Sequence, residues 1–258
     1  MSYGDEAGPL AIAHRGGAGL AVENSVTAFA LSAALGLRYL ETDVHVTRDG
    51  HLVCFHDATL ERLTSATGRV RSRSLSELRR LRVAGREPIA TLEEVLDAFP
   101  EHRLTIDVKD RAAIAPLVRS LRRRGVAERV CVAGAWDGWL AEVSAQVPDV
   151  AAALGWRSLT ALLLCARTGT RPPRALATGP FAHVPIKLGR VPVFVERLVE
   201  MSHDIGVRVV TWTVNDPPTM RQLLDVGVDA IITDRPDLLR EVLVSRGQWV
   251  PLRSPTRG

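Results

Sequence analysis

Short apolar runs alternate with amphipathic stretches along almost the whole chain. Nine runs have the length and composition of strands: 10–14, 40–46, 51–56, 103–109, 129–134, 149–155, 181–187, 208–214 and 229–234. Between them lie stretches with helical spacing, most clearly 24–35, 112–124, 193–205, 216–226 and 236–245. Strands that alternate with helices predict parallel βα units.

Nine strands are one more than a closed (β/α)8 barrel requires, and a hairpin signal explains the surplus. The segment TRDG at 47–50 places Asp-Gly between two strand-like runs, which is typical of a tight β-hairpin. We therefore expect 51–56 to run antiparallel beside the second strand, within an insertion at about 47–101. The sequence predicts an α/β fold, a (β/α)8 TIM-type barrel with a small insertion after strand two. A single domain over 1–258 suits the usual size of about 250 residues, and 247–258 is expected to form a flexible tail.

Composition excludes some classes of function. The 258 residues carry a net charge of +4, and the basic residues are dispersed without interleaved aromatic residues, so no nucleic-acid partner is expected. The cysteines, Cys54, Cys131 and Cys165, lie far apart among apolar neighbours and are expected to be buried free thiols in a reducing compartment. The N-terminal segment lacks the features of a signal peptide, and no apolar run is long enough to cross a bilayer. We expect a cytoplasmic protein without stable membrane insertion.

Charged side chains recur on one face of two predicted strands. Glu41 and Asp43 alternate in ETDVHV, and Asp107 and Lys109 alternate in LTIDVK, so each pair points to one side of its strand. Charges inside a barrel are costly unless they are paired or bind a metal, and the carboxyl ends of barrel strands line the active site. His45 lies one step beyond the carboxylates and is assigned a structural role.

Other residues at the same predicted rim complete a candidate site. His14 and Arg15 end the first strand, and His56 ends the hairpin strand. Carboxylates can hold a hard divalent cation, Arg15 and Lys109 can neutralise a phosphate, and two imidazoles can exchange protons near neutral pH. This combination suits phosphodiester cleavage. Each residue alone also allows a simpler interpretation. The HRG segment could form a surface turn, and Glu41 and Asp43 could belong to a structural ion-pair network. His56 and Asp57 could form an ordinary loop pair, and Lys109 could be a solvated strand end.

Taken in chain order, these segments resemble the glycerophosphodiester phosphodiesterase family. The resemblance covers about residues 10–240 and rests on HRGG, ENS, ETDVHVTRDG followed by HD, LTIDVK, TWTVND and IITDRPD. It implies a metal-binding barrel with an insertion after strand two. The residue roles that it implies are an acid–base pair of His14 and His56, phosphate or substrate contacts from Arg15, Lys109 and Trp212, and metal ligands Glu41, Asp43 and Asp107.

The chain departs modestly from the family pattern. Asp107 stands where the family usually has Glu, which shortens one predicted metal ligand by a methylene. Calcium tolerates irregular oxygen geometry better than magnesium, so Ca²⁺ is slightly favoured over Mg²⁺ as the single divalent ion. The segment AGAW at 133–136 replaces a turn that often contains serine.

The activity implied by the resemblance is metal-dependent hydrolysis of small glycerophosphodiesters to sn-glycerol 3-phosphate and an alcohol. In the expected mechanism the glycerol 2-hydroxyl attacks phosphorus and water then opens a cyclic phosphate. Two alternatives stay open. A related phosphodiesterase could act on another headgroup, such as a lysophospholipid or a sugar phosphodiester. A barrel of this kind could also bind phosphorylated ligands without catalysis.

Overall fold

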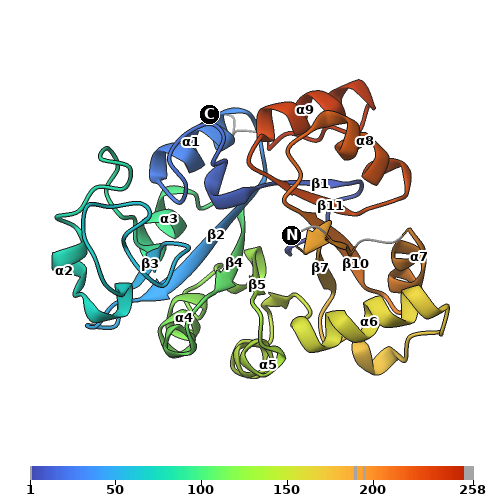
Figure 1. Ribbon diagram of the computed structural model, residues 1–258, viewed down its shortest axis with the longest axis horizontal. Coiled ribbons are helices and arrows are strands. Elements are labelled where there is room, and N and C mark those ends of the chain that lie inside the picture. The colour runs from blue at the N-terminus through green and yellow to red at the C-terminus, as the bar shows by residue number, and fades with distance from the viewer. Residues whose placement is uncertain (1, 189–190, 194–195, 253–258) are drawn as a thin grey trace.

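The computed structural model describes residues 2–188, 191–193 and 196–252. Within these ranges eight parallel strands form a nearly closed barrel surrounded by helices (Figure 1). The parallel strands are β1 Leu10–Ala13, β2 Tyr39–Val46, β4 Arg103–Val108, β5 Val130–Ala133, β6 Ala151–Ala152, β7 Phe181–Pro185, β10 Arg208–Trp212 and β11 Ala230–Thr233. The helices are α1 Val26–Ala34, α2 Leu75–Leu78, α3 Leu92–Ala98, α4 Ile114–Leu121, α5 Asp137–Gln146, α6 Trp156–Thr168, α7 Arg197–His203, α8 Pro217–Asp225 and α9 Pro236–Ser245.

The predicted TIM-type barrel is confirmed by the order of its strands. Hydrogen-bonded neighbours follow the order β6-β5-β4-β2-β1-β11-β10-β7. The two end strands meet through a parallel bridge between Ala153 and Phe181, and the Leu154 N–H donates to the Phe181 carbonyl oxygen at 2.8 Å. Because the strands are parallel, all their carboxyl ends lie on one face, where active sites form in such barrels.

The hairpin after the second strand is also confirmed. β3 (Leu52–Cys54) pairs antiparallel with the end of β2, with His45 opposite Val53. Residues after β3 form a small separate core around Phe55 and Leu60, so the insertion folds as a unit beside the barrel. Helix α3 falls within the predicted insertion 47–101, but its buried side chains pack in the core between strands and helices.

Two apolar cores support the barrel itself. The larger lies between the strands and the surrounding helices, and a smaller one fills the barrel interior. Tyr3 enters the interior at the amino ends of the strands, where its hydroxyl lies 2.5 Å from Thr105 Oγ1 and its ring packs edge-on against Tyr39 and Phe181. The amino end of the barrel is therefore filled, which leaves the carboxyl end as the open face.

A short antiparallel pair, β8 (Lys187–Leu188) and β9 (Val191–Pro192), follows β7. Of the segment predicted as a flexible tail, 253–258 lies outside the described residues. The part before it is packed, because Trp249 contacts the outer core and the Leu252 N–H donates to the Gly36 carbonyl oxygen at 2.9 Å. No helix in the described part of the chain is long and apolar enough to cross a membrane.

Candidate active site

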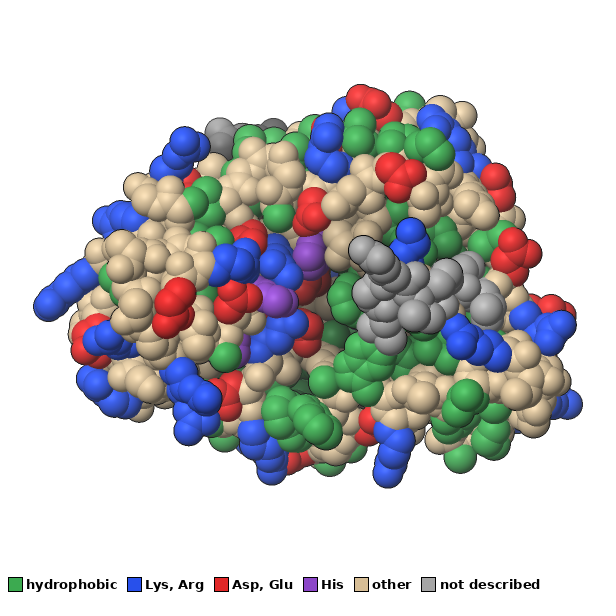
Figure 2. Space-filling view, viewed as in Figure 1, with side chains coloured by type: hydrophobic (Ala, Val, Ile, Leu, Met, Phe, Trp, Pro, Cys, Tyr) green, Lys and Arg blue, Asp and Glu red, His purple; other side chains and the backbone are tan. Residues whose placement is uncertain are grey.

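A cavity of about 270 Å³ opens at the carboxyl face of the barrel. Figure 2 shows this hollow with histidine, acidic and basic side chains on one side and hydrophobic side chains on the side of α5 and α6. All the side chains singled out in the sequence line it: His14, Arg15, Glu41, Asp43, His56, Asp107, Lys109 and Trp212. The fold thus brings together residues from five separate segments of the chain.

The register of β2 against β4 places the acidic side chains. Glu41 lies beside Thr105 and Asp43 beside Asp107, and alternation along each strand points all four into the barrel. Glu41 and Asp43 are almost completely buried. The parity inferred from the sequence was therefore correct for both strands.

The HRGG segment forms a tight turn at the end of β1. Arg15 adopts a left-handed backbone conformation with φ of 49°, and its N–H donates to Glu41 Oε2 at 2.7 Å. Gly16 has φ of 80°, and a Cβ there would lie 2.8 Å from the Phe29 ring. The glycine is required because α1 packs closely against the turn and because the backbone there is left-handed.

Each of the two candidate catalytic histidines is held by an aspartate. His14 Nδ1 lies 2.7 Å from Asp234 Oδ1, and His56 Nδ1 lies 2.6 Å from Asp57 Oδ1. A carboxylate accepts hydrogen bonds, so in each neutral imidazole Nδ1 carries the proton and Nε2 has the free lone pair. This tautomer is the one that a general base at Nε2 requires.

The charged neighbours of His14 change its proton affinity. Burial alone would lower the pKa of His14, but the hydrogen bond to Asp234 and the negative charge of Glu41 outweigh it and raise that pKa. For Asp234 the opposite holds: burial would raise its pKa, and the hydrogen bond to His14 brings it below the ordinary value. The two shifts agree in sign, because both reflect a charge-assisted pair.

A chain of ion pairs ties the insertion to the first turn of the barrel. Arg15 pairs with Glu23 at 2.9 Å, and Arg62 donates two hydrogen bonds of 2.8 Å to the same carboxylate. Arg62 also contacts Asp57 at 2.5 Å and holds its pKa at about 2. The insertion thereby fixes Asp57, the partner of His56, against the barrel.

His45 does not line the cavity. Its Nε2 lies 3.1 Å from the His56 carbonyl oxygen, and burial lowers the pKa of His45. A neutral imidazole with a proton on Nε2 donates to that oxygen and holds the backbone of His56. This agrees with the structural role assigned to His45 from the sequence.

The predicted metal ligands share the cavity with a lysine. Lys109 Nζ lies 3.0 Å from Asp43 Oδ1 and 2.5 Å from Asp107 Oδ2. Burial is the main cause of a raised pKa for Glu41, and the negative charge of Asp43 raises that pKa further. Among the residues that the structure describes, no three metal-ligating side chains are grouped closely enough to hold one ion. The carboxylates are suitable ligands for a hard cation, but Asp107 is engaged by Lys109, so the metal site stays a prediction.

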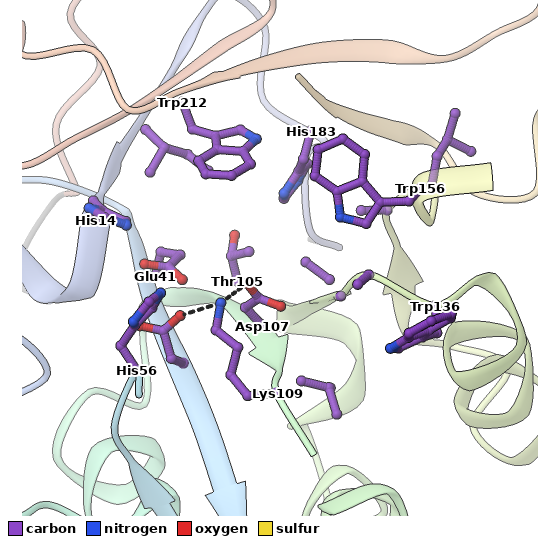
Figure 3. A pocket seen from close by; sticks show the side chains of 18 of the residues that line it. His14, Glu41, His56, Thr105, Asp107, Lys109, Trp136, Trp156, His183 and Trp212 are labelled. Atoms are coloured by element: carbon purple, nitrogen blue, oxygen red, sulfur yellow. Dashed lines mark hydrogen bonds and ion pairs between the residues drawn. The ribbon is translucent and has the colours of Figure 1, made fainter. Parts of the chain in front are cut away.

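Several site residues were missed at the level of sequence. Asp234 was seen only as part of a motif, Asp57 only as one member of a possible loop pair, and His183 was given no role. His183 on β7 lines the cavity together with Trp136, Trp139 and Trp156. Figure 3 shows Trp156 and Trp136 on the side of the cavity away from His14 and His56. The AGAW segment was the available signal, since it places an aromatic residue just after a barrel strand.

Comparison with known proteins agrees with this site. The model of the glycerophosphoryl diester phosphodiesterase family matches residues 14–238. Probable glycerophosphodiester phosphodiesterase 2 of Mycobacterium tuberculosis is 37% identical over 247 residues, which cover 94% of this chain and 93% of that protein. A glycerophosphodiester phosphodiesterase of Caldanaerobacter subterraneus is 30% identical over 247 residues, with 89% of this chain and 96% of that protein covered.

A solved structure supports the fold. The phosphodiesterase of Oleispira antarctica, in complex with the product sn-glycerol-3-phosphate, superimposes with a TM-score of 0.76 at 23% identity and covers 92% of this chain and 97% of its own. The fold, the arrangement of the cavity and the family match lead to one conclusion. The chain belongs to the glycerophosphoryl diester phosphodiesterase family and is a phosphodiester hydrolase.

Proposed function

We propose that the protein hydrolyses small glycerophosphodiesters to sn-glycerol 3-phosphate and a free alcohol. The observation that carries this proposal is the pair of aspartate-held imidazoles, His14 and His56, in one cavity with Arg15 and Lys109. Two proton-transfer groups beside two cations are the parts that a phosphodiester cleavage needs. The names of the relatives from Mycobacterium tuberculosis and Caldanaerobacter subterraneus support the same substrate class.

The histidines would act in two successive steps. In the first, one imidazole accepts the proton of the glycerol 2-hydroxyl at Nε2, the hydroxyl oxygen attacks phosphorus, and the other imidazole protonates the departing alcohol. The product is a cyclic phosphate. In the second step water adds to phosphorus with the two histidines in exchanged roles, which opens the ring to glycerol 3-phosphate. The imidazole that acts as the acid starts as an imidazolium with a proton on Nε2. Each step moves one proton to one imidazole and one from the other, so the starting protonation is restored after both steps.

Cationic side chains would hold the phosphoryl oxygens. Arg15 is fixed by Glu23 and by Asp43, whose Oδ2 lies 3.2 Å from Arg15 Nε. Lys109 carries a raised pKa, because the charges of Asp107 and Asp43 outweigh its burial, and it is positively charged at neutral pH. A guanidinium and an ammonium held in place stabilise negative charge on phosphate without reorganisation.

A divalent ion, Ca²⁺ or Mg²⁺, is part of the proposal. Glu41, Asp43 and Asp107 would hold it, and when bound it would supply positive charge to the phosphoryl oxygens. The raised pKa of Glu41 supports a cation there, since buried carboxylates without enough countercharge resist ionisation. Binding through Asp107 requires that this carboxylate exchange Lys109 for the ion.

Trp212 would form a wall for the glycerol carbons. It ends β10, is half-buried and lines the cavity above Glu41 and Thr105 (Figure 3). Holding the hydroxyl beside phosphorus makes the attack intramolecular, which can lower a barrier by roughly 7–11 kcal/mol.

The test is a panel of glycerophosphodiesters assayed for release of glycerol 3-phosphate with and without chelator. Release that depends on a divalent ion supports the proposal, whereas release from none of the substrates contradicts it. Glycerophosphocholine and its 2-deoxy analogue separate the two routes of attack. The analogue should bind without reacting, and similar turnover of both would show that water attacks phosphorus directly.

A further inference from the structure

The cavity has two chemically different ends. The end described above holds every charged side chain among the described residues that line it. The opposite end, between α5 and α6 on one side and β7 on the other, is lined by alanine, leucine and tryptophan side chains and by His183 (Figure 3). Apart from that imidazole the end is apolar, so it is suited to a part of the substrate other than the phosphate.

Tryptophan rings dominate the apolar end. Trp136 precedes α5 and is 61% exposed at the mouth, with its ring centroid 5.9 Å from that of Trp139. Trp156 begins α6 and is half-buried. Figure 3 shows His183 between Trp156 and Trp212, which extends the ring-lined surface toward the catalytic groups. A ligand at this end would meet aromatic rings from more than one side.

The imidazole at this end is uncharged. Burial lowers the pKa of His183 to about 4, so the side chain is neutral at neutral pH. Its Nε2 atom is buried without a hydrogen-bond partner in the described part of the protein. A neutral ring adds to the aromatic lining and does not repel a cation.

Three kinds of group could enter the apolar end, and their requirements differ. A long acyl chain needs space, but the cavity of about 270 Å³ is slightly smaller than the usual ligand pocket, and the phosphodiester must share it. A primary ammonium needs hydrogen-bond acceptors, and among the residues that the structure describes no carboxylate lines this end. A quaternary ammonium donates no hydrogen bond and is attracted by the faces of aromatic rings, most strongly by indole.

We propose that Trp136, Trp139 and Trp156 form a subsite for a quaternary ammonium group, so that the preferred substrate is the choline ester of glycerol phosphate. This inference rests on the proposed function, because the polar end of the same cavity must hold the phosphodiester. The negative charge of the bound phosphodiester accompanies the cation, which is why the subsite needs no carboxylate of its own. The positive charge of the quaternary ammonium, which the faces of the rings attract, also distinguishes this ligand from an uncharged apolar group of the same shape.

The first experiment measures binding and does not depend on turnover. Tetramethylammonium is titrated against the full-length protein by calorimetry, with tert-butanol as an uncharged compound of similar bulk. We expect saturable binding of tetramethylammonium, and weaker binding or none of tert-butanol. Trp136→Leu and Trp156→Leu keep an apolar side chain but remove the ring, and each should lose this binding. Because Trp136 is mostly exposed, its substitution leaves the fold intact even if the second variant is unstable.

The matched control is Trp249→Leu. Trp249 lies in a separate pocket with Leu10 and Tyr39 and stacks near the guanidinium of Arg240, whose central carbon is 6.0 Å from the ring centroid. This variant should bind tetramethylammonium as the unmodified protein does. Equal loss in the control would show that the effect comes from stability and would overturn the assignment of the subsite.

The second experiment compares glycerophosphocholine with its 3,3-dimethylbutyl ester, in which carbon replaces the charged nitrogen. The choline ester should have a kcat/KM about five- to thirtyfold higher, the range of a cation–π contact in a partly desolvated site. In Trp136→Leu and Trp156→Leu this ratio should fall toward one. Equal kcat/KM for the two esters in the unmodified protein, or preference for the ethanolamine ester or for an acylated lysophospholipid, would overturn the inference. If no ester releases glycerol 3-phosphate, the proposed function fails, and the tetramethylammonium titration still decides on the subsite.

Discussion

The substitution Asp234→Asn tests how the site sets the protonation of His14. Asp234 Oδ1 lies 2.7 Å from His14 Nδ1, and its Oδ2 accepts from Asn215 Nδ2 at 2.7 Å. In the variant the new amide keeps its oxygen toward the Asn215 donor, so its NH₂ group faces His14. Nδ1 must then accept, which moves the proton to Nε2 and removes the lone pair needed there.

The size of the effect follows from two contributions. A hydrogen bond with a charged partner contributes about 1.5–3 kcal/mol, which corresponds to a loss of roughly ten- to a hundredfold in rate. The wrong tautomer adds to this loss, up to the range of about 10² to 10⁴ for a positioned acid–base group. We therefore expect kcat to fall by about 10² to 10⁴. Because Asp234 helps to raise the pKa of His14, the limb of the pH–rate profile that depends on His14 should move to lower pH.

The assay is steady-state release of glycerol 3-phosphate across a range of pH, together with the thermal midpoint. The double variant Asp234→Asn with Asn215→Ala is the informative control. Without the Asn215 donor the amide at 234 is free to turn its oxygen to His14, so part of the lost activity should return. If Asp234→Asn keeps kcat within about threefold and leaves the pH profile unchanged, the proposed tautomer control is wrong.

Three further outcomes are expected. His14→Ala and His56→Ala should each lower turnover by on the order of 10² to 10⁴, whereas His45→Ala should cost much less; equal damage from all three would contradict the separation of catalytic and structural histidines. Chelation should abolish turnover, and Ca²⁺ or Mg²⁺ should restore it. Because the pKa of Glu41 is raised, protons compete with the ion, and calorimetry should show weaker metal binding as the pH falls below neutral. Gly16→Ala should destabilise the fold by at least about 1 kcal/mol, measured by denaturant unfolding, since its φ of 80° disfavours any side chain.

The architecture was largely predictable because its signals are local. Alternation of strands and helices, and the Asp-Gly turn at 49–50, were enough to predict eight parallel strands with one antiparallel addition. The orientation of Glu41 and Asp43 also followed from the chain, since side chains in a strand alternate between two faces. Packing of residues 247–252 was not foreseen, because it depends on contacts with Gly36, in the turn after α1, and with the outer core, which no local pattern reveals.

The candidate active site shows where local information ended. From the sequence, residue types and strand parity determined that His14, Glu41, Asp43 and Asp107 would meet at one rim of a barrel. Only the tertiary structure decided the partners of those groups, because they come from segments far apart in the chain. Asp234 is 220 positions from His14, yet closure of the barrel places the two side chains in contact.

The orientation of the rings at the apolar end of the cavity was decided by tertiary structure. A tryptophan after a barrel strand can face the core, the solvent or a cavity, and the sequence pattern is the same in each case. The docking of α5 and α6 against the barrel turned Trp136 and Trp156 toward the same cavity as the histidines. The sequence thus determined the fold and the residue types at the charged end of the cavity, through local periodicity. The packing of helices on the barrel determined the other end, because only contacts between distant segments orient those rings.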